Sequence, residues 1–141
     1  MIMMIKEDLA ESIKPRVKKV CRDYDVIVAY LHGSFAEGKQ HPESDIDIAV
    51  YFKEYSLKKL LEVSRRIHEE INLDREIDVT ALNTADSRFQ FRVIQKGNIL
   101  YQTDPKERAD IEVMIDRKYH DIKHHLEEHW EERKKKVIEG G

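Results

Sequence analysis

The sequence predicts an α/β (α+β) domain, in which helices flank a small mixed sheet and a long helix forms the C-terminal part. The first observation behind this fold class is that short segments with strand periodicity alternate with segments of helical periodicity. The second is an unbroken helical pattern over about residues 105–137. The third is a composition of 40% hydrophobic and 38% charged residues, which is typical of a folded chain with a core. We therefore expect residues 1–141 to form a single domain.

Four segments have the periodicity of strands. Residues 26–31 are a continuous apolar run rich in β-branched side chains, which is typical of a buried central strand. Residues 45–52 and 76–82 alternate between polar and apolar side chains, so each predicts a strand with one face on the core. Residues 99–101 predict a short final strand.

Two helices are expected before the third strand. The first follows an apolar stripe over residues 9–24, but Pro15 interrupts it and removes a backbone donor. We therefore expect a kink, or two helices that meet near residues 13–15. Ser56 is the expected N-cap of the second helix, whose apolar positions run to Ile71.

Two further helices follow the third strand. Asp86 or Ser87 is the expected N-cap of a short helix that ends at Gly97. Pro105 stands in the first turn of the last helix, where a missing backbone donor costs little. Helical spacing in that helix predicts one apolar stripe, formed by Ile115, Tyr119, Ile122, Leu126 and Trp130. This stripe is either core packing or, where the helix extends past a small domain, a surface for a partner or for self-association.

Charge and composition exclude several classes of protein. The formal net charge of −3 provides no basic excess, so direct nucleic-acid binding is not expected. Cys21 is the only cysteine, which rules out an intramolecular disulfide and favours a reducing compartment. No apolar run approaches the length of a membrane span. These observations predict a soluble cytoplasmic protein without membrane contact.

Three aspartates on strand-like segments are candidate metal ligands. Asp45 and Asp47 are two residues apart, so their side chains point to the same face of the sheet. At a separation of about 6–7 Å they repel by roughly 2.5 kcal/mol, which water, a shifted pKa or a divalent cation can relieve. Asp78 lies on the polar face of the next strand and joins them if the two strands are neighbours. Carboxylates suit Mg²⁺, and three of them can hold two ions that activate a hydroxyl and bind a triphosphate. Asp78 would then assist deprotonation of the hydroxyl.

Gly33 and Ser34 follow the first apolar strand and open a turn-rich loop over residues 33–44. A glycine at this position lets the backbone approach a phosphate, and the Ser34 hydroxyl can donate to phosphate oxygens. A helical turn after Ser34 would add its positive end. The pair is therefore a candidate nucleotide-binding element.

Each of these features alone has an ordinary structural explanation, but their spacing is specific. Ten residues separate Ser34 from Asp45, and the third aspartate follows on a later strand. This arrangement resembles the G-S-x10-D-x-D signature of the DNA polymerase β nucleotidyltransferase superfamily. Residues 32–38, 44–50 and 76–83 are most similar to the minimal nucleotidyltransferases, the MntA-type antitoxins, and the similarity extends to the C-terminal helix. Glu37 departs from related motifs, which often carry arginine there.

The resemblance implies the nucleotidyltransferase fold and an activity. Members transfer a nucleoside monophosphate from a nucleoside triphosphate to a hydroxyl with Mg²⁺ and release pyrophosphate. The MntA type implies transfer of AMP from ATP to a tyrosine of a HEPN-type toxin, which is thereby silenced. Larger members use antibiotics or RNA ends as acceptors and carry an extra acceptor-binding domain, for which this chain leaves no residues. A protein acceptor is therefore expected, and the long helix is expected to contribute to partner contact.

Two alternatives to this function remain open. One is a noncatalytic antitoxin that silences its partner by occlusion alone, although all three carboxylates are present. The other is a nucleotidyltransferase for a small molecule such as an aminoglycoside. Separately, the last helix carries two pairs of histidines at zinc-binding spacing, but no cysteine accompanies them, and a solvated or partner-facing surface is the favoured interpretation. These residues are His120, His124, His125 and His129.

Overall fold

The computed structural model describes residues 6–33 and 45–140, with a four-stranded mixed sheet at its centre. The strands are β1 (Val26–His32), β2 (Ile46–Phe52), β3 (Ile77–Ala81) and β4 (Asn98–Gln102), in the spatial order β3-β2-β1-β4. β1 pairs antiparallel with β2 and with β4, whereas β2 and β3 are parallel. The predicted fold class and all four strands are confirmed.

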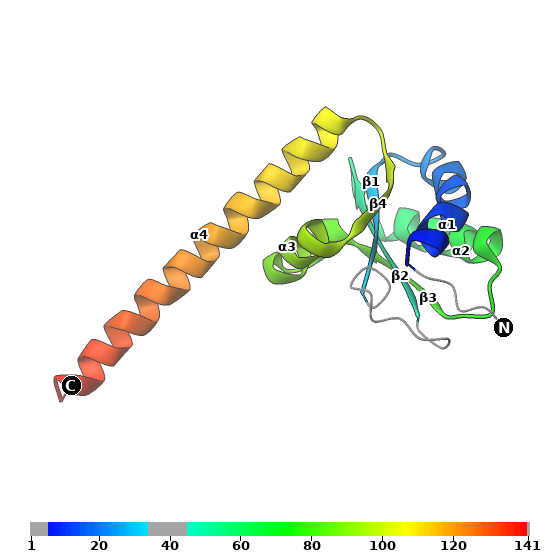
Figure 1. The fold of residues 1–141 in the computed structure, drawn as a ribbon. Coiled ribbons are helices and arrows are strands. Elements are labelled where there is room, and N and C mark those ends of the chain that lie inside the picture. The colour runs from blue at the N-terminus through cyan, green and yellow to red at the C-terminus, as the bar shows by residue number, and fades with distance from the viewer. Residues whose placement is uncertain (1–5, 34–44, 141) are drawn as a thin grey trace.

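Helices cover both faces of the sheet (Figure 1). On one face lie α1 (Lys6–Cys21) and α2 (Leu57–Ile71), and on the other lie α3 (Ser87–Lys96) and α4 (Pro105–Ile138). Side chains along β2 point alternately toward these two layers. Ile46, Ile48 and Phe52 pack with α1 and α2, while Ala49 packs with α3 and α4. Asp47 belongs to the same alternating set as Ala49, so it faces the α3 side.

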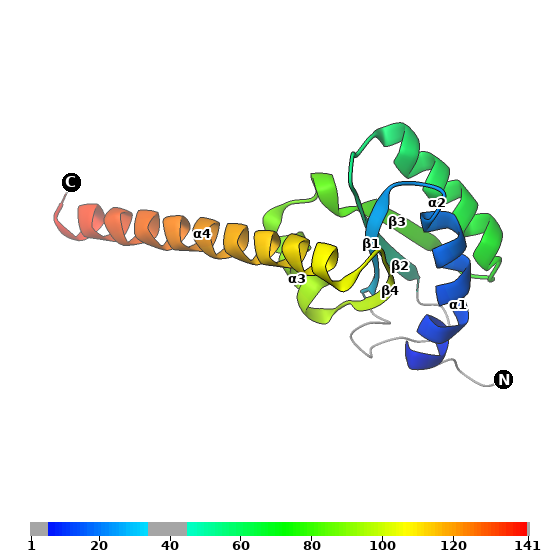
Figure 2. The ribbon, with the colours of Figure 1, turned by 90° about the horizontal axis from the view of Figure 1, so that it is seen from above.

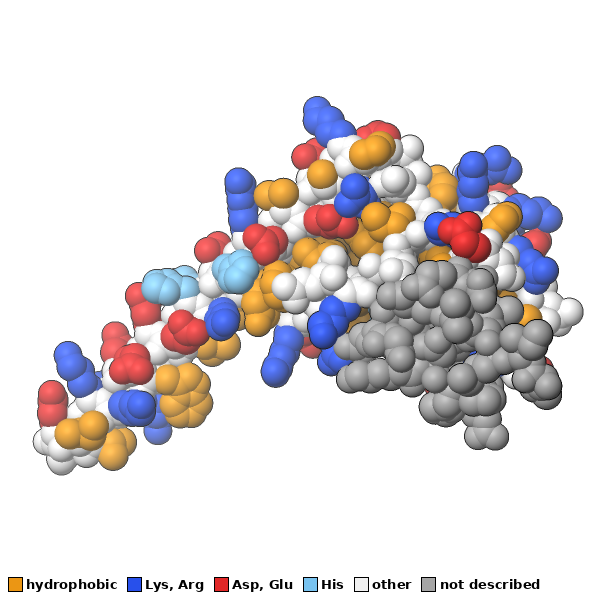
Figure 3. Space-filling view, viewed as in Figure 1, with side chains coloured by type: hydrophobic (Ala, Val, Ile, Leu, Met, Phe, Trp, Pro, Cys, Tyr) orange, Lys and Arg blue, Asp and Glu red, His pale blue; other side chains and the backbone are white. Residues whose placement is uncertain are grey.

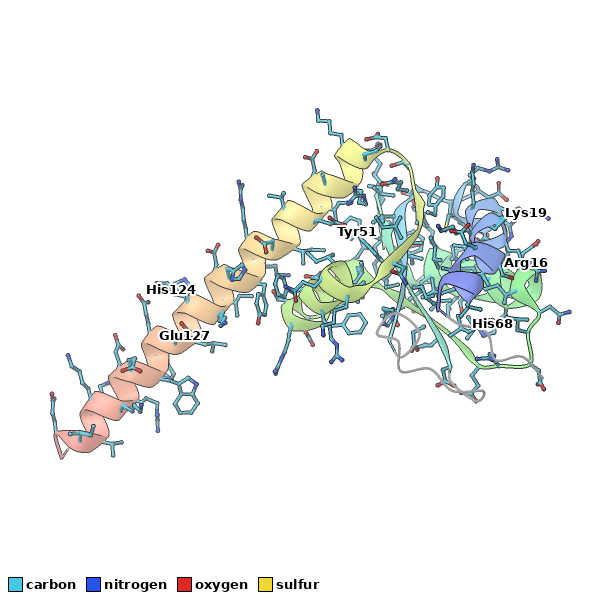
Figure 4. All side chains as sticks on the ribbon, in the orientation of Figure 1. Arg16, Lys19, Tyr51, His68, His124 and Glu127 are labelled. Atoms are coloured by element: carbon cyan, nitrogen blue, oxygen red, sulfur yellow. The ribbon has the colours of Figure 1, made fainter. Side chains whose placement is uncertain are left out.

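A kink or two helices was expected at Pro15, and because α1 is continuous through Pro15, the second of these alternatives was wrong. The reason is burial on both sides of the proline. Leu9, Ile13 and Val17 are fully buried against the sheet, and their burial offsets the roughly 3 kcal/mol that an interior proline costs a helix. Arg16 also ties α1 to the end of α2, since its guanidinium donates to the carbonyl oxygen of Ile71 at 2.7 Å (Figure 4).

The expected N-caps Ser56 and Asp86 are present, and Asp104 caps α4 in the same way. Ser56, Asp86 and Asp104 each accept a hydrogen bond from the backbone N–H three residues on, which satisfies a donor that the helix leaves unpaired. A short 3₁₀ turn over Leu82–Thr84 links β3 to α3. Within it, Asn83 exchanges two hydrogen bonds with the backbone of Phe52, at 2.8 and 2.9 Å. This turn therefore fixes the path from β3 to α3 against β2.

The α4 helix extends far beyond the sheet (Figures 1 and 2). Ile111 and Ile115 in its first half are buried, whereas every residue from His120 to Gly140 is exposed. Only its first turns therefore belong to the layered domain. Among the helices of residues 6–33 and 45–140, none combines the length and apolar character needed to cross a membrane.

Candidate active site

Three polar residues lie in one row across the sheet. His32 on β1 stands opposite Asp47 on β2, and Asp47 stands opposite Asp78 on β3. Residues directly opposite one another on neighbouring strands share a face, with Cβ atoms about 5 Å apart. The parallel pairing of β2 and β3, which α2 connects, places Asp47 and Asp78 side by side and so meets the condition that the two strands be neighbours.

Asp45 completes the carboxylate group from the residue just before β2. It is exposed, Asp78 is exposed, and Asp47 between them is half-buried. Desolvation, followed by the nearby charges of Asp78 and Asp45, raises the pKa of Asp47 from 3.8 to about 6. Burial and the two neighbouring carboxylates thus favour the protonated form of Asp47, and a bound cation would relieve the same repulsion.

Gly33 lies against the Asp47 carboxylate at the end of β1. Its φ of +76° is in the left-handed region that favours glycine, and a Cβ atom built there would collide with Oδ2 of Asp47. Two features of the structure thus favour glycine at position 33: the left-handed backbone conformation and the lack of room for a Cβ atom beside Asp47. Ser34, which the sequence paired with Gly33 as a nucleotide-binding element, lies outside the described residues. So does the helical turn expected after it.

A cavity of about 340 Å³ opens in front of this row. His32, Gly33, Asp47 and Asp78 line its sheet side, and the α3 helix lines the other. The α3 residues are Phe89, Arg92, Val93 and Lys96. The Phe89 ring meets the His32 ring edge-on, with 5.3 Å between the ring centroids.

Sequence reasoning missed His32, Arg92 and Lys96 as lining residues. Arg92 and Lys96 are four residues apart and so share one face of α3, a signal that the sequence contains. That this face opens toward the aspartates depends on where α3 lies over β1, which periodicity alone does not reveal.

Residues 15–106 match the protein family described as Polymerase beta, Nucleotidyltransferase. The chain belongs to this family. The matched residues include Gly33, Asp47 and Asp78, which the structure brings together. The expected nucleotidyltransferase class is confirmed on this ground. A search of curated proteins found no match.

Solved structures of toxin–antitoxin complexes share the nucleotidyltransferase fold seen here. One, a toxin–antitoxin with AMP-PNP, is 23% identical with a TM-score of 0.64, covering 89% of this chain and 98% of that chain. Another contains a tri-AMPylated Shewanella oneidensis HEPN toxin with an MNT antitoxin. It is 20% identical with a TM-score of 0.61, covering 92% of this chain and 98% of that chain.

The carboxylate oxygens at the cavity fit Mg²⁺, which shares its ligands with water and substrate, better than a metal whose ligands all come from the protein. Within residues 6–33 and 45–140, no cluster of three or more His, Cys, Asp or Glu side chains is arranged to hold a metal ion by itself. The pair of Asp47 and Asp78, with Asp45 beside them, instead offers hard carboxylate oxygens at an open cavity. Mg²⁺ binds in this way, through one or two carboxylates together with waters and substrate phosphates. The four histidines of α4 also belong to no such cluster, and His124 pairs with Glu128 at 3.1 Å.

We expect the raised pKa of Asp47 to make the metal-free nucleotidyltransferase less stable as pH rises from about 4 to about 6. Below this window Asp47 is protonated in both states, and within it only the unfolded chain has lost its proton, so ionisation favours unfolding. Because the carboxylate is partly exposed to solvent, this shift of about two pKa units should lower the free energy of unfolding by only about 1 kcal/mol. Urea denaturation in EDTA should show Asp47→Asn gaining this stability over wild type at pH 7 but not at pH 4. Equal differences at both pH values would contradict the expectation.

Proposed function

We propose that this chain is a cytoplasmic antitoxin that transfers AMP from ATP to a tyrosine hydroxyl of a HEPN-type toxin and thereby silences it. The observation that carries the proposal is the row of Asp47 and Asp78 facing a cavity, with Asp45 and Gly33 beside it. The family supports nucleotidyl transfer. The complexes with AMP-PNP and with an AMPylated HEPN toxin support the nucleotide and the acceptor, because their antitoxins have the same fold.

Asp45, Asp47 and Asp78 would hold Mg²⁺, two ions in the full arrangement, with Gly33 and Ser34 against the triphosphate. Bound Mg²⁺ supplies positive charge where negative charge develops on the transferred phosphoryl group. The tyrosine oxygen attacks the α-phosphorus and forms a new O–P bond. The bond from that phosphorus to the bridging oxygen breaks, and pyrophosphate leaves with the electron pair. Asp78, which is exposed and lines the cavity, would accept the tyrosine proton.

A transfer assay tests this proposal. The purified protein is incubated with Mg²⁺, ATP labelled on the α-phosphate, and its HEPN-type partner. We expect label on the partner, pyrophosphate in solution, and neither in the Asp45→Asn/Asp47→Asn double variant. If the double variant neutralised the toxin as well as wild type did, a noncatalytic antitoxin would replace this proposal. Label on an aminoglycoside but not on the toxin would favour a small-molecule transferase.

We further propose that the exposed half of α4 is where the toxin docks, on a domain formed by residues 1–141. The apolar stripe that includes buried Ile115 continues through Ile122, Leu126 and Trp130, where no other part of the described chain lies beneath it. Figure 3 shows hydrophobic side chains along this part of α4 between charged ones. An apolar stripe that continues a packed face but lacks a partner of its own is typical of an interface. The solved antitoxins, matched over 98% of their length, were crystallised with their toxins.

We expect Leu126→Glu and Trp130→Glu each to weaken toxin binding by at least about 10-fold, because each places a charge in an apolar contact. Isothermal titration calorimetry with the toxin measures the change. Leu61→Glu is the matched control, since Leu61 on α2 is 61% exposed and Trp130 is 63% exposed. Unchanged affinity in both α4 variants would contradict the proposal. Loss of a homodimer in light scattering, with toxin affinity kept, would assign the stripe to self-association instead.

A further inference from the structure

Two basic residues on α3 line the cavity across from the carboxylates. Arg92 and Lys96 stand one helical turn apart on the face that also carries Val93, which is almost fully buried. The cavity wall on the sheet side is acidic, with Asp47 and Asp78, and the wall on the α3 side is basic. A molecule that fits both walls carries negative charge together with a divalent cation.

The α3 helix is firmly positioned over the sheet. The buried side chain of Gln90 donates to the carbonyl oxygen of Leu82 at 2.7 Å, which ties α3 to the 3₁₀ turn. On the outer side, the ring of Phe91 stacks on Tyr119 of α4, with 4.1 Å between the centroids. In addition, Asp86 caps the N-terminus of α3. These three contacts hold in place the helix that carries Arg92 and Lys96.

The end of α3 lies at the end of β1, where Gly33 is found. Gly97 follows Lys96, and a Cβ atom built at Gly97 would lie 3.2 Å from the carbonyl oxygen of Leu31 and 3.3 Å from Cβ of Tyr30. Lys96 and Gly33 line the same cavity. A phosphate bound next to Gly33 would therefore lie in the cavity that Lys96 also lines.

We propose that Arg92 and Lys96 bind the β- and γ-phosphates of the nucleotide, that is, the pyrophosphate that leaves. This inference rests on the proposed nucleotidyl transfer and adds its leaving-group subsite. A triphosphate beside three carboxylates keeps excess negative charge even with two divalent cations bound, and a guanidinium and an ammonium at the cavity wall reduce that excess. Arg92 presents a planar fork that matches two phosphate oxygens, whereas Lys96 adds a compact charge.

Nucleotide binding by the full-length protein in Mg²⁺ tests this subsite. We expect Arg92→Ala and Lys96→Ala each to raise the dissociation constants of ATP and inorganic tripolyphosphate about 10-fold, and the double variant to raise them about 100-fold. The dissociation constant of AMP, which lacks these phosphates, should stay unchanged. Lys96→Arg should restore most of the ATP affinity. Arg88→Ala is the matched control, because Arg88 is exposed on the same helix and does not line the cavity.

The outcomes separate the two proposals. If wild-type protein binds neither ATP nor tripolyphosphate, the proposed function fails and this inference fails with it. If wild type binds and transfers AMP but the double variant binds ATP as tightly, only the subsite is wrong. Equal weakening for AMP and ATP would also overturn it, because the residues would then act on the nucleoside part or on the fold. Circular dichroism of each variant checks that α3 remains folded.

Discussion

Replacing Asp47 by asparagine should lower the rate of AMP transfer about 10³-fold without unfolding the protein. Asp47 occupies the centre of the polar row, opposite both His32 and Asp78, so any cation shared by the carboxylates depends on it. Losing the charge removes several kcal/mol of metal-based stabilisation of the transition state, and each 1.4 kcal/mol is about tenfold in rate. Asparagine keeps the shape of the side chain, so packing is preserved.

Single-turnover kinetics with saturating ATP and toxin measure this effect. Asp74→Asn is the control, because Asp74 is an exposed aspartate in the connection before β3 and does not line the cavity. Thermal unfolding with Mg²⁺ and ATP gives a second readout: ligand should stabilise wild type and the control but not Asp47→Asn. Transfer by Asp47→Asn within tenfold of wild type would show that the carboxylate row is not the metal site.

Replacing Gly33 by alanine should lower transfer about 100-fold through displacement of Asp47. The new methyl group would collide with Oδ2 of Asp47, and that side chain can yield by rotating away. Rotation preserves the fold but moves a metal ligand, and a shift of about 1 Å at a reacting centre costs about 100-fold. The left-handed φ of +76° adds about 1–2 kcal/mol of backbone strain to the loss of stability.

Gly140→Ala separates these two causes. Gly140 has the same φ of +76°, but a Cβ atom built there meets nothing within 4 Å. Both variants therefore carry the backbone strain, and only Gly33→Ala displaces the carboxylate. Initial rates of AMP transfer, with denaturation curves for both proteins, distinguish the effects. Full activity in Gly33→Ala would contradict the proposed contact between this glycine and Asp47.

The strands and the polar face of the site could be predicted from local sequence because two-residue periodicity determines which side chains share a face. That rule alone predicts that the side chains of Asp45 and Asp47 point to the same face of the sheet. The pairing of Asp47 with Asp78 needed one tertiary fact, that β3 lies beside β2 in parallel, and the sequence left this conditional. Roles in metal binding and catalysis remain predictions for all three aspartates.

What the sequence could not reveal depends on packing between distant elements. The basic wall formed by Arg92 and Lys96 exists because Gln90 and Phe91 fix α3 over the end of β1, and periodicity does not encode that placement. The expectation of two helices at Pro15 was wrong for a related reason, since burial against the sheet overrides a local signal. The length of α4 was predictable, but the point near His120 where it leaves the domain was not.

The intact mass of the partner toxin tests the central claim most directly. The toxin is incubated with this protein, Mg²⁺ and each nucleoside triphosphate in turn, and its mass is compared with that of toxin incubated with the Asp45→Asn/Asp47→Asn variant. We predict that the toxin gains the mass of one or more AMP groups with ATP and wild-type protein only, at a tyrosine located by peptide fragmentation. A toxin that is silenced while its mass stays unchanged would contradict nucleotidyl transfer as the basis of this antitoxin.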